Sequence, residues 1–177
     1  MMAGETVRLR AWCEADLPAL LRWRNDVALQ AQLLARARGS NEAQVREWLR
    51  ERACGSNLFF VVADRHTDAA LGYLQFTGLD SVDRRADLGI CLAPEAQGRG
   101  AGSEALRLAF AYLRETWNLR KVSLRVRSDN ERAVRCYRRL GFEPCGLLRE
   151  HVCIEGSWRD VVLMDLFLGP AAPGALP

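Results

Sequence analysis

Residues 97–103 read Gln-Gly-Arg-Gly-Ala-Gly-Ser, and this glycine-rich stretch decides how the rest of the chain is interpreted. It stands between an apolar run that Pro94 ends and a helical pattern that begins near Ser103. Glycines let a backbone turn sharply and come close to a ligand, and the start of a helix adds unpaired N–H groups and a positive dipole end. The stretch therefore predicts a cradle for an anion, and a diphosphate suits it.

Three phosphate-binding patterns compete for this stretch, and two of them do not fit. The loop of nucleotide triphosphatases requires a lysine, which residues 97–103 lack. The dinucleotide loop requires a third glycine where this chain has Ser103, and its βαβ unit with a later acidic residue is also missing. The pattern Q/R-x-x-G-x-G/A is met by Gln97, Gly100 and Gly102. Taken alone, the stretch leaves an ordinary glycine-rich turn before a helix as the alternative.

A second pattern follows one predicted strand later. Residues 130–142 match N-x-x-A-x-x-x-Y-x-x-x-G-F at Asn130, Ala133, Tyr137, Gly141 and Phe142. Together the two patterns resemble the cofactor-binding elements of the GNAT superfamily of N-acetyltransferases, in the same order and at the family's usual separation. The resemblance extends from about Val7 to Leu168.

The resemblance implies that acetyl-CoA is a cosubstrate and that the glycine-rich loop holds its diphosphate. The loop residues in this role are Gln97, Gly98, Arg99, Gly100, Ala101, Gly102 and Ser103. Asn130 would face the pantetheine arm, and Tyr137 would give a proton to the departing thiolate. Each has a structural alternative, because Asn130 can simply cap a helix and an inward tyrosine is usually a core residue.

The run 87–93, Asp-Leu-Gly-Ile-Cys-Leu-Ala, matches the family's central strand. The resemblance implies that this strand splays from its neighbour, so that backbone groups of Ile90, Cys91 and Leu92 pair with the pantetheine and one N–H stabilises an oxyanion. Asp87 is the candidate general base, and its alternative is a polar residue at the entrance of a strand. How much base is needed depends on the pKa of the acceptor amine.

Hydrophobic periodicity predicts strands and helices in mixed order. Strands are expected over 7–11, 58–64, 70–77, 87–92, 121–126, 143–154 and 158–168. Helices are expected over 16–24, 27–36, from Asn41 onward, 103–116 and 131–140. Hairpins mixed with crossover helices indicate an α/β chain, with a mixed, largely antiparallel sheet of six to seven strands and helices on both faces. This is the GNAT fold that the resemblance implies.

The amine acceptor is predicted from weaker similarities, among them one around Trp23 to Asp26 and one around His151. These segments resemble the branch of the family that contains ribosomal-protein N-terminal acetyltransferases. The same branch also contains polyamine and amino-sugar acetyltransferases. Substrate contacts are expected from Trp23, Asn25, Asp26 and His151. Their alternatives are a core residue for Trp23, a turn for Asn25 and Asp26, and a structural histidine. The sequence shows no concentrated acidic patch, so a protein N-terminal α-amine is favoured. An amino sugar, a polyamine, or a CoA-binding module without turnover are the alternatives.

Composition and charge indicate which classes of binding partner are not expected. The net charge of +3 is small, and arginines alternate with acids along predicted helices, so nucleic acid is not expected. No apolar run approaches the roughly 18 residues of a membrane span, and no secretory pattern is present, so we expect a cytoplasmic protein without membrane contact. The cysteines lack C-x-x-C spacing, so we expect no metal. We expect one domain over 1–168, a flexible tail over 169–177, and either a monomer or a homodimer.

Overall fold

An eight-stranded sheet organises residues 2–169, the part of the chain that the computed structural model describes. Its strands are β1 (Met2–Ala3), β2 (Val7–Arg10), β3 (Leu58–Asp64), β4 (Ala70–Asp80), β5 (Arg85–Leu92), β6 (Lys121–Arg127), β7 (Glu143–Ile154) and β8 (Ser157–Phe167). They lie in the order β1-β2-β3-β4-β5-β6-β8-β7, and only β5 and β6 run parallel. The mixed, largely antiparallel sheet is confirmed. The additional strand is β1, whose two residues are too few to show a periodicity.

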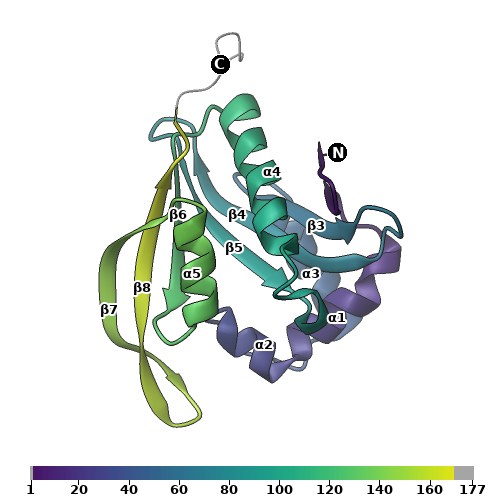
Figure 1. Ribbon diagram of the computed structural model, residues 1–177. Helices are drawn as coiled ribbons and strands as arrows, with labels where there is room; N and C mark the ends of the chain where they lie inside the picture. Colours follow the sequence, from purple (N-terminus) through teal and green to yellow (C-terminus); the bar gives the residue numbers. More distant parts are fainter. Residues whose placement is uncertain (1, 170–177) are drawn as a thin grey trace.

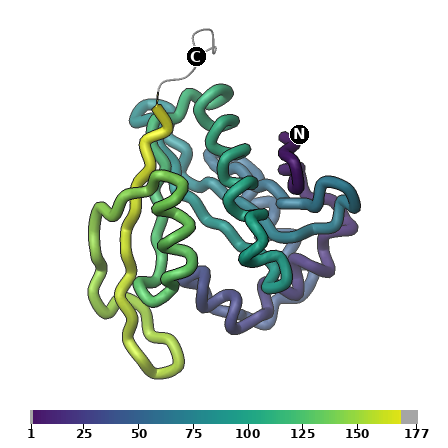
Figure 2. Tube along the Cα trace, viewed as in Figure 1, coloured from purple at the N-terminus to yellow at the C-terminus, as the bar shows by residue number. Residues whose placement is uncertain are grey.

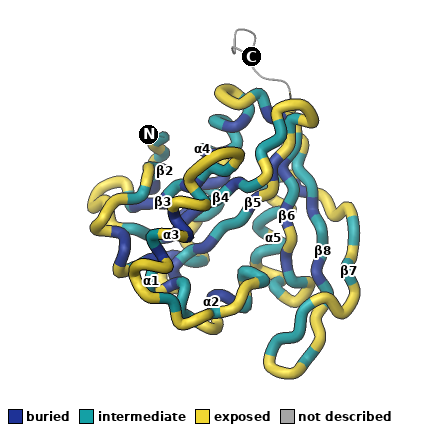
Figure 3. The backbone as a smooth tube through the Cα atoms, turned by 180° about the vertical axis from the view of Figure 1, so that it is seen from behind, coloured by how far each residue is buried: buried dark blue, intermediate teal, exposed yellow. Residues whose placement is uncertain are grey.

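Helices cover both faces of this sheet, as Figures 1 and 3 show from opposite sides. The first face carries α4 (Ala101–Thr116) and α5 (Glu131–Arg139), and the second face carries α1 (Leu17–Asn25), α2 (Val27–Gln32) and α3 (Glu42–Arg52). Two short 3-10 helices, η1 (Glu14–Asp16) and η2 (Pro94–Ala96), precede α1 and the glycine-rich loop. No helix among residues 2–169 is both long and apolar enough to span a bilayer.

Each face of the sheet has its own hydrophobic core. The core of the first face lies under α4 and contains Leu88 of β5, with Ile90 packed against it. The core of the second face lies under α1 and α3 and contains Cys91. Because successive side chains of a strand point to opposite faces, Asp87 and Gly89 project toward the second face.

Local signals explain most helix ends. Asn41 and Gln44 cap α3 reciprocally, each side chain bonding the other's backbone N–H at 3.0 and 2.9 Å. The helix expected over 27–36 is wrong in length, because α2 ends at Gln32. The backbone turns back there, with Leu34 at a φ of 56°. Apart from Gly169, the expected tail over 169–177 lies outside the described residues.

The central strands separate partway along their length. β5 and β6 pair from Arg85 with Lys121 to Leu88 with Leu124, and no pairing follows. β5 nevertheless continues to Leu92 and β6 to Arg127, and the two segments diverge in Figure 2. The splayed central strand is therefore confirmed, and it leaves an opening inside the sheet.

Candidate active site

A cavity of about 940 Å³ lies where β5 and β6 part. Leu106 of α4 and Tyr137 of α5 line it from the first face of the sheet. Leu29 of α2 and Arg52 of α3 line it from the second face. We call these two parts of the cavity the cofactor side and the acceptor side. The opening in the sheet thus lets residues from both faces line one cavity.

The glycine-rich loop borders the cofactor side. Two of its glycines are required by the backbone conformation, and the third is required by close packing. Gly98 and Gly100 have φ values of 77° and 87°, and a Cβ on either would meet no atom within 4 Å. They are needed for backbone conformation, and the space beside them is open to a ligand. A Cβ on Gly102 would stand 2.9 Å from Cδ1 of Leu92, because α4 packs closely on β5 here.

The start of α4 and the arginines of α5 make the cofactor side attractive to anions. The first helical hydrogen bond runs from the Glu104 N–H to the Gly100 carbonyl at 3.0 Å, so the three preceding N–H groups have no acceptor within the helix. Arg132, Arg135 and Arg139 also line the cavity. These three arginines are exposed, and their side chains also face the cavity. The loop and the arginines together fit a diphosphate.

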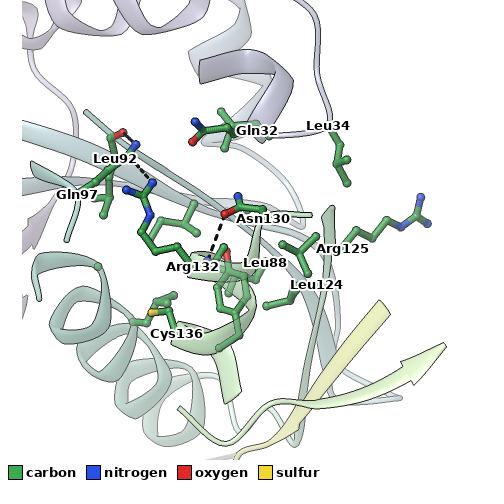
Figure 4. A pocket seen from close by; sticks show the side chains of 18 of the residues that line it. Gln32, Leu34, Leu88, Leu92, Gln97, Leu124, Arg125, Asn130, Arg132 and Cys136 are labelled. Atoms are coloured by element: carbon green, nitrogen blue, oxygen red, sulfur yellow. Dashed lines mark hydrogen bonds between the residues drawn. The ribbon is translucent and has the colours of Figure 1, made fainter. Parts of the chain in front are cut away.

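The Gln97 side chain connects the glycine-rich loop to β5 and to α5 by hydrogen bonds. Its Nε2 donates to the Leu92 carbonyl at 2.9 Å, and its Oε1 accepts from the Arg132 guanidinium (Figure 4). Of the backbone groups expected to pair with pantetheine, the Leu92 carbonyl is thus already bonded. The Cys91 side chain points into the second core, where burial raises the pKa of its thiol to about 12, so it cannot serve as a nucleophile.

Tyr137 reaches the cavity from α5. Its ring packs edge-on against Phe142 at 5.7 Å, and burial raises the pKa of its phenol above the ordinary value, with a further rise from Cys136. The Cys136 thiol in turn lies 3.3 Å from the Ser103 hydroxyl, which links α5 to the first turn of α4. Tyr137 therefore stays protonated throughout the neutral range, beside the loop that would hold the cofactor.

Asn130 caps a helix, whereas the side chains of the loop residues Arg99 and Ala101 do not line the cavity. The Asn130 side chain accepts from the Ala133 N–H at 3.2 Å and so caps α5, while it also lines the cavity (Figure 4). Arg99 is exposed and does not line the cavity. Ala101 is 7% exposed and belongs to the core under α4.

The acceptor side is polar and carries Asp87. Its exposed carboxylate stands on β5, and the neighbouring Gln75 and Thr77 of β4 line the same space. The Oε1 atom of Gln75 is buried and has no hydrogen-bond partner among the described residues. Gln32 of α2 and Arg52 of α3 also line this side, together with Leu29. The acceptor side can therefore hold a polar group beside a single carboxylate.

Three of the four residues predicted to contact the substrate lie elsewhere. Trp23 is 1% exposed and is part of the core under α1 and α3. The Asn25 side chain bonds the backbone of Ser40 at 2.7 and 2.8 Å, and Asp26 caps α2 by accepting a backbone N–H at 2.8 Å. These side chains position α1, α2 and the loop after them, because polar groups next to helix ends satisfy the backbone first. His151 is exposed and does line the cavity.

The sequence did not indicate several lining residues. They are Gln32, Arg52, Gln75, Thr77, Arg125, Arg132, Arg135 and Arg139. Strand alternation would have placed Gln75 and Thr77 on the face of Asp87 once the register of β4 on β5 was known. No such local signal exists for Arg52. No cluster of three or more His, Cys, Asp or Glu side chains within residues 2–169 is placed to hold a metal ion.

Comparison of the sequence with known proteins identifies a protein family that matches most of the chain. Residues 6–143 match the family model described as an acetyltransferase (GNAT) domain. The spermidine N(1)-acetyltransferase of Escherichia coli K12 is 36% identical over 96 residues, which are 54% of this chain and 52% of that protein. The ribosomal protein uS5-alanine N-acetyltransferase of E. coli K12 is 30% identical over 121 residues, which are 68% of this chain and 62% of that protein. The matches thus span half to three-fifths of these relatives.

Solved structures agree with the fold. The spermidine N-acetyltransferase of Vibrio cholerae, crystallised with CoA and spermine, superposes with a TM-score of 0.84 at 26% identity. The superposition covers 92% of this chain and 95% of that chain. A probable acetyltransferase with 23% identity and a TM-score of 0.79 shares the fold.

Proposed function

The chain belongs to the GNAT acetyltransferase family, and from that premise we propose that it transfers the acetyl group of acetyl-CoA to a primary amine. The observation that carries the proposal is the cavity between β5 and β6, which joins an anion cradle on one face to a polar pocket on the other. An acetyltransferase needs such an arrangement, because thioester and amine must meet in one place.

Acetyl-CoA would supply an activated acetyl thioester. The glycine-rich loop and the start of α4 would hold its diphosphate by backbone N–H groups, with Arg132 and Arg135 adding charge. The edge of β5 from Gly89 onward, which β6 leaves unpaired, would offer backbone hydrogen bonds to the pantetheine arm. These are roles for backbone and for exposed charge, and they require no metal.

Tyr137 would act on the leaving sulfur. A thiol with a pKa near that of cysteine, about 8.5, leaves as a thiolate and is helped by a nearby proton donor. Because burial raises the pKa of Tyr137, its hydroxyl keeps its proton at neutral pH and is always available as a donor. No covalent enzyme intermediate is proposed.

Asp87 would act on the amine. It projects from β5 toward the acceptor side, whereas Tyr137 approaches from the first face. The amine would lose its proton toward Asp87, directly or through water, before it attacks the thioester. Proton acceptance and proton donation would then take place on opposite sides of the sheet.

The acceptor is a separate part of the proposal. The relatives named for spermidine support the small polyamine that the sequence left as an alternative better than the protein N-terminus that it favoured. The relative named for the alanine of a ribosomal protein keeps that second candidate open. We therefore propose a small-molecule amine as the acceptor. The homodimer stays a prediction that analytical ultracentrifugation would test.

The test is a turnover assay with an independent measurement of cofactor binding. Purified protein and acetyl-CoA are given polyamines, amino sugars, amino acids and N-terminal peptides, with thiol release and product mass followed together. Amine-dependent thiol release with an added acetyl group supports the proposal. Tight CoA binding without release for every amine would instead identify a CoA-binding module.

A further inference from the structure

The charge of the cavity wall is unusual for an enzyme that would accept a polycation. Asp87 is the only carboxylate among the described residues that line the cavity, whereas five arginines line it. Three of these arginines belong to α5, on the cofactor side. The remaining two, Arg52 and Arg125, lie on the acceptor side, so this side is positive even with Asp87 ionised.

Arg125 lies on the acceptor side by strand alternation. Leu124 and Val126 point into the core under α4, so the residue between them projects to the opposite face. The next residue on that face, Arg127, contacts the Ala31 carbonyl of α2 at 3.4 Å. Figure 4 shows the guanidinium of Arg125 directed away from the glycine-rich loop, which places its charge at the outer end of the pocket.

Arg52 belongs to a cluster of three arginines, Arg24, Arg38 and Arg52. The guanidinium of Arg24 lies 4.4 Å over the ring of Trp48, and its Nε atom is buried without a hydrogen-bond partner among the described residues. Burial lowers the pKa of Arg24, and the positive charges of Arg52 and Arg38 lower it further, while Tyr73 and Glu51 partly oppose this shift. Within residues 2–169, no acidic side chain forms an ion pair with any of the three. The charge of Glu51 also acts on Arg24, but Glu51 forms no ion pair with it, so the three like charges have no close ionic partner among the described residues.

Like charges of which one is partly buried are stabilised when an anion binds beside them. Like charges repel, and burying part of a guanidinium adds a desolvation cost. A bound carboxylate or phosphate removes both penalties through charge-assisted hydrogen bonds, which arginine makes with two parallel N–H groups. A polyamine would add a further positive charge to the same place and would be rejected.

Building on the proposed function, we infer that the acceptor amine carries a carboxylate or phosphate group, which binds Arg52 on the acceptor side while the amine lies toward Asp87. The inference deepens that function by naming the chemical class of the acceptor. It differs from what the names of the spermidine-acting relatives suggest, and it rests on the lining of this chain's own cavity.

The test measures acceptor binding separately from turnover. Protein saturated with CoA is titrated calorimetrically with two matched pairs: 4-aminobutyrate against 1,4-diaminobutane, and glucosamine 6-phosphate against glucosamine. In at least one pair, the anionic member should bind at least about tenfold more tightly than its partner. Which pair shows the larger ratio distinguishes a carboxylate from a phosphate.

Variants of Arg52 then test whether this residue causes the preference for the anionic amine. Arg52→Ala should weaken binding of the anionic member by roughly 10-fold to 100-fold and leave its partner unchanged, and Arg52→Lys should restore part of the loss. Arg50→Ala is the matched control, because Arg50 stands on the same helix, is exposed and does not line the cavity. It should leave every affinity unchanged.

Two results would overturn the inference while leaving the proposed function intact. One is tighter binding of 1,4-diaminobutane or spermidine than of either anionic amine. The other is a preference for anions that Arg52→Ala does not alter. Failure to bind CoA, or to release thiol with any amine, would instead contradict the proposed function.

Discussion

Leu88 of β5 and Leu124 of β6 are the last residues that pair the two parallel strands. Beyond them, β5 remains paired with β4 as far as Leu92, and β6 remains paired with β8 as far as Arg127. The sheet therefore opens from within, since paired strands would stand only about 4.8 Å apart. The opening explains how residues of opposite faces come to line one cavity.

This opening also gives the proposed reaction a direction. The thioester would enter from the face of α4 and α5, and the amine from the face of α1 to α3. Tyr137 and Asp87 would then approach the reacting atoms from opposite faces of the sheet. The group that donates a proton is thereby kept apart from the group that accepts one. The following predictions test the two sides separately.

Gly100→Ala should weaken CoA binding about tenfold. Gly100 has a φ of 87° at the start of α4, and an alanine there costs roughly 1–2 kcal/mol unless the loop changes shape. Isothermal titration with CoA measures the effect. Gly55→Ala is the control, because Gly55 has a φ of 60°, equally open space and no place in the cavity. If Gly55→Ala lost as much affinity for CoA, strain in the loop would not be the cause.

Tyr137→Phe should lower kcat about 100-fold and leave the affinity for CoA nearly unchanged. The change removes one hydroxyl, keeps the ring packed on Phe142, and deletes the proton donor for the leaving sulfur. Steady-state thiol release measures kcat. Tyr112→Phe is the control, because Tyr112 packs on Phe60 outside the active-site cavity. Full turnover by Tyr137→Phe would reduce Tyr137 to a core residue.

The pH profile should lack an alkaline limb from Tyr137. An acid whose pKa is raised keeps its proton to higher pH, and burial raises the pKa of Tyr137 above its usual value of about 10. With saturating amine, kcat should therefore rise to a plateau and hold until about pH 10. A fall centred near pH 8 or 9 that disappears in Tyr137→Phe would contradict the raised pKa of Tyr137, although it would still assign the proton donor to this residue.

Patterns that depend on neighbours in the chain could be predicted from the sequence. The capping of α3 by Asn41 and Gln44 and the turns at Gly98 and Gly100 are of this kind, because local geometry fixes them. The splay of β5 came from the family resemblance. The end of α2 was missed, because nothing in the sequence near Leu34 marks a positive φ.

The acceptor side shows why the rest could not be predicted. Arg52 reaches the cavity because α3 packs on the second face, and Gln75 does so because β4 is in register with β5. Both facts depend on contacts between segments far apart in sequence. Trp23 and Asp26 were predicted as substrate contacts, but the Trp23 ring is buried in a hydrophobic core and the Asp26 carboxylate caps a helix.

Asp16→Asn should lower the free energy of unfolding by about 3 kcal/mol at pH 7. Arg10 donates to the Asp16 carboxylate at 2.7 and 2.8 Å, and Asp16 is 3% exposed. The change removes this buried partner and leaves Arg10 paired only with the more exposed Asp68. Urea denaturation measures it. Glu14→Gln, which affects an exposed pair with Arg46, should leave the midpoint nearly unchanged.

The same pair makes stability depend on pH. Burial alone would raise the pKa of Asp16, but the hydrogen bonds from Arg10 and the Cys13 N–H outweigh it, so the pKa is lowered. The stabilisation is therefore present above the unfolded pKa of about 3.9 and is lost as pH falls through the folded value. The difference in unfolding free energy between the wild-type protein and Asp16→Asn should therefore shrink as the pH falls below about 3.9. A constant difference between them from pH 7 to pH 2 would contradict the ion pair.

Asp87→Asn should slow acetylation most for amines of high pKa. At pH 7 an amine with a pKa near 7.8 is roughly one-seventh neutral, whereas one near 10.4 is neutral in only about one molecule in 2,500. A base therefore matters more for the second amine, and we expect kcat/KM to fall about 100-fold for it and less than about tenfold for the first.

The comparison needs both amines, several pH values and one control. Asp83→Asn serves as the control, because Asp83 is an exposed carboxylate before β5 that does not line the cavity. Raising the pH should restore activity to Asp87→Asn, because deprotonated amine becomes abundant without help from the enzyme. Equal losses for the two amines at every pH would show that Asp87 holds the amine by charge and does not accept its proton.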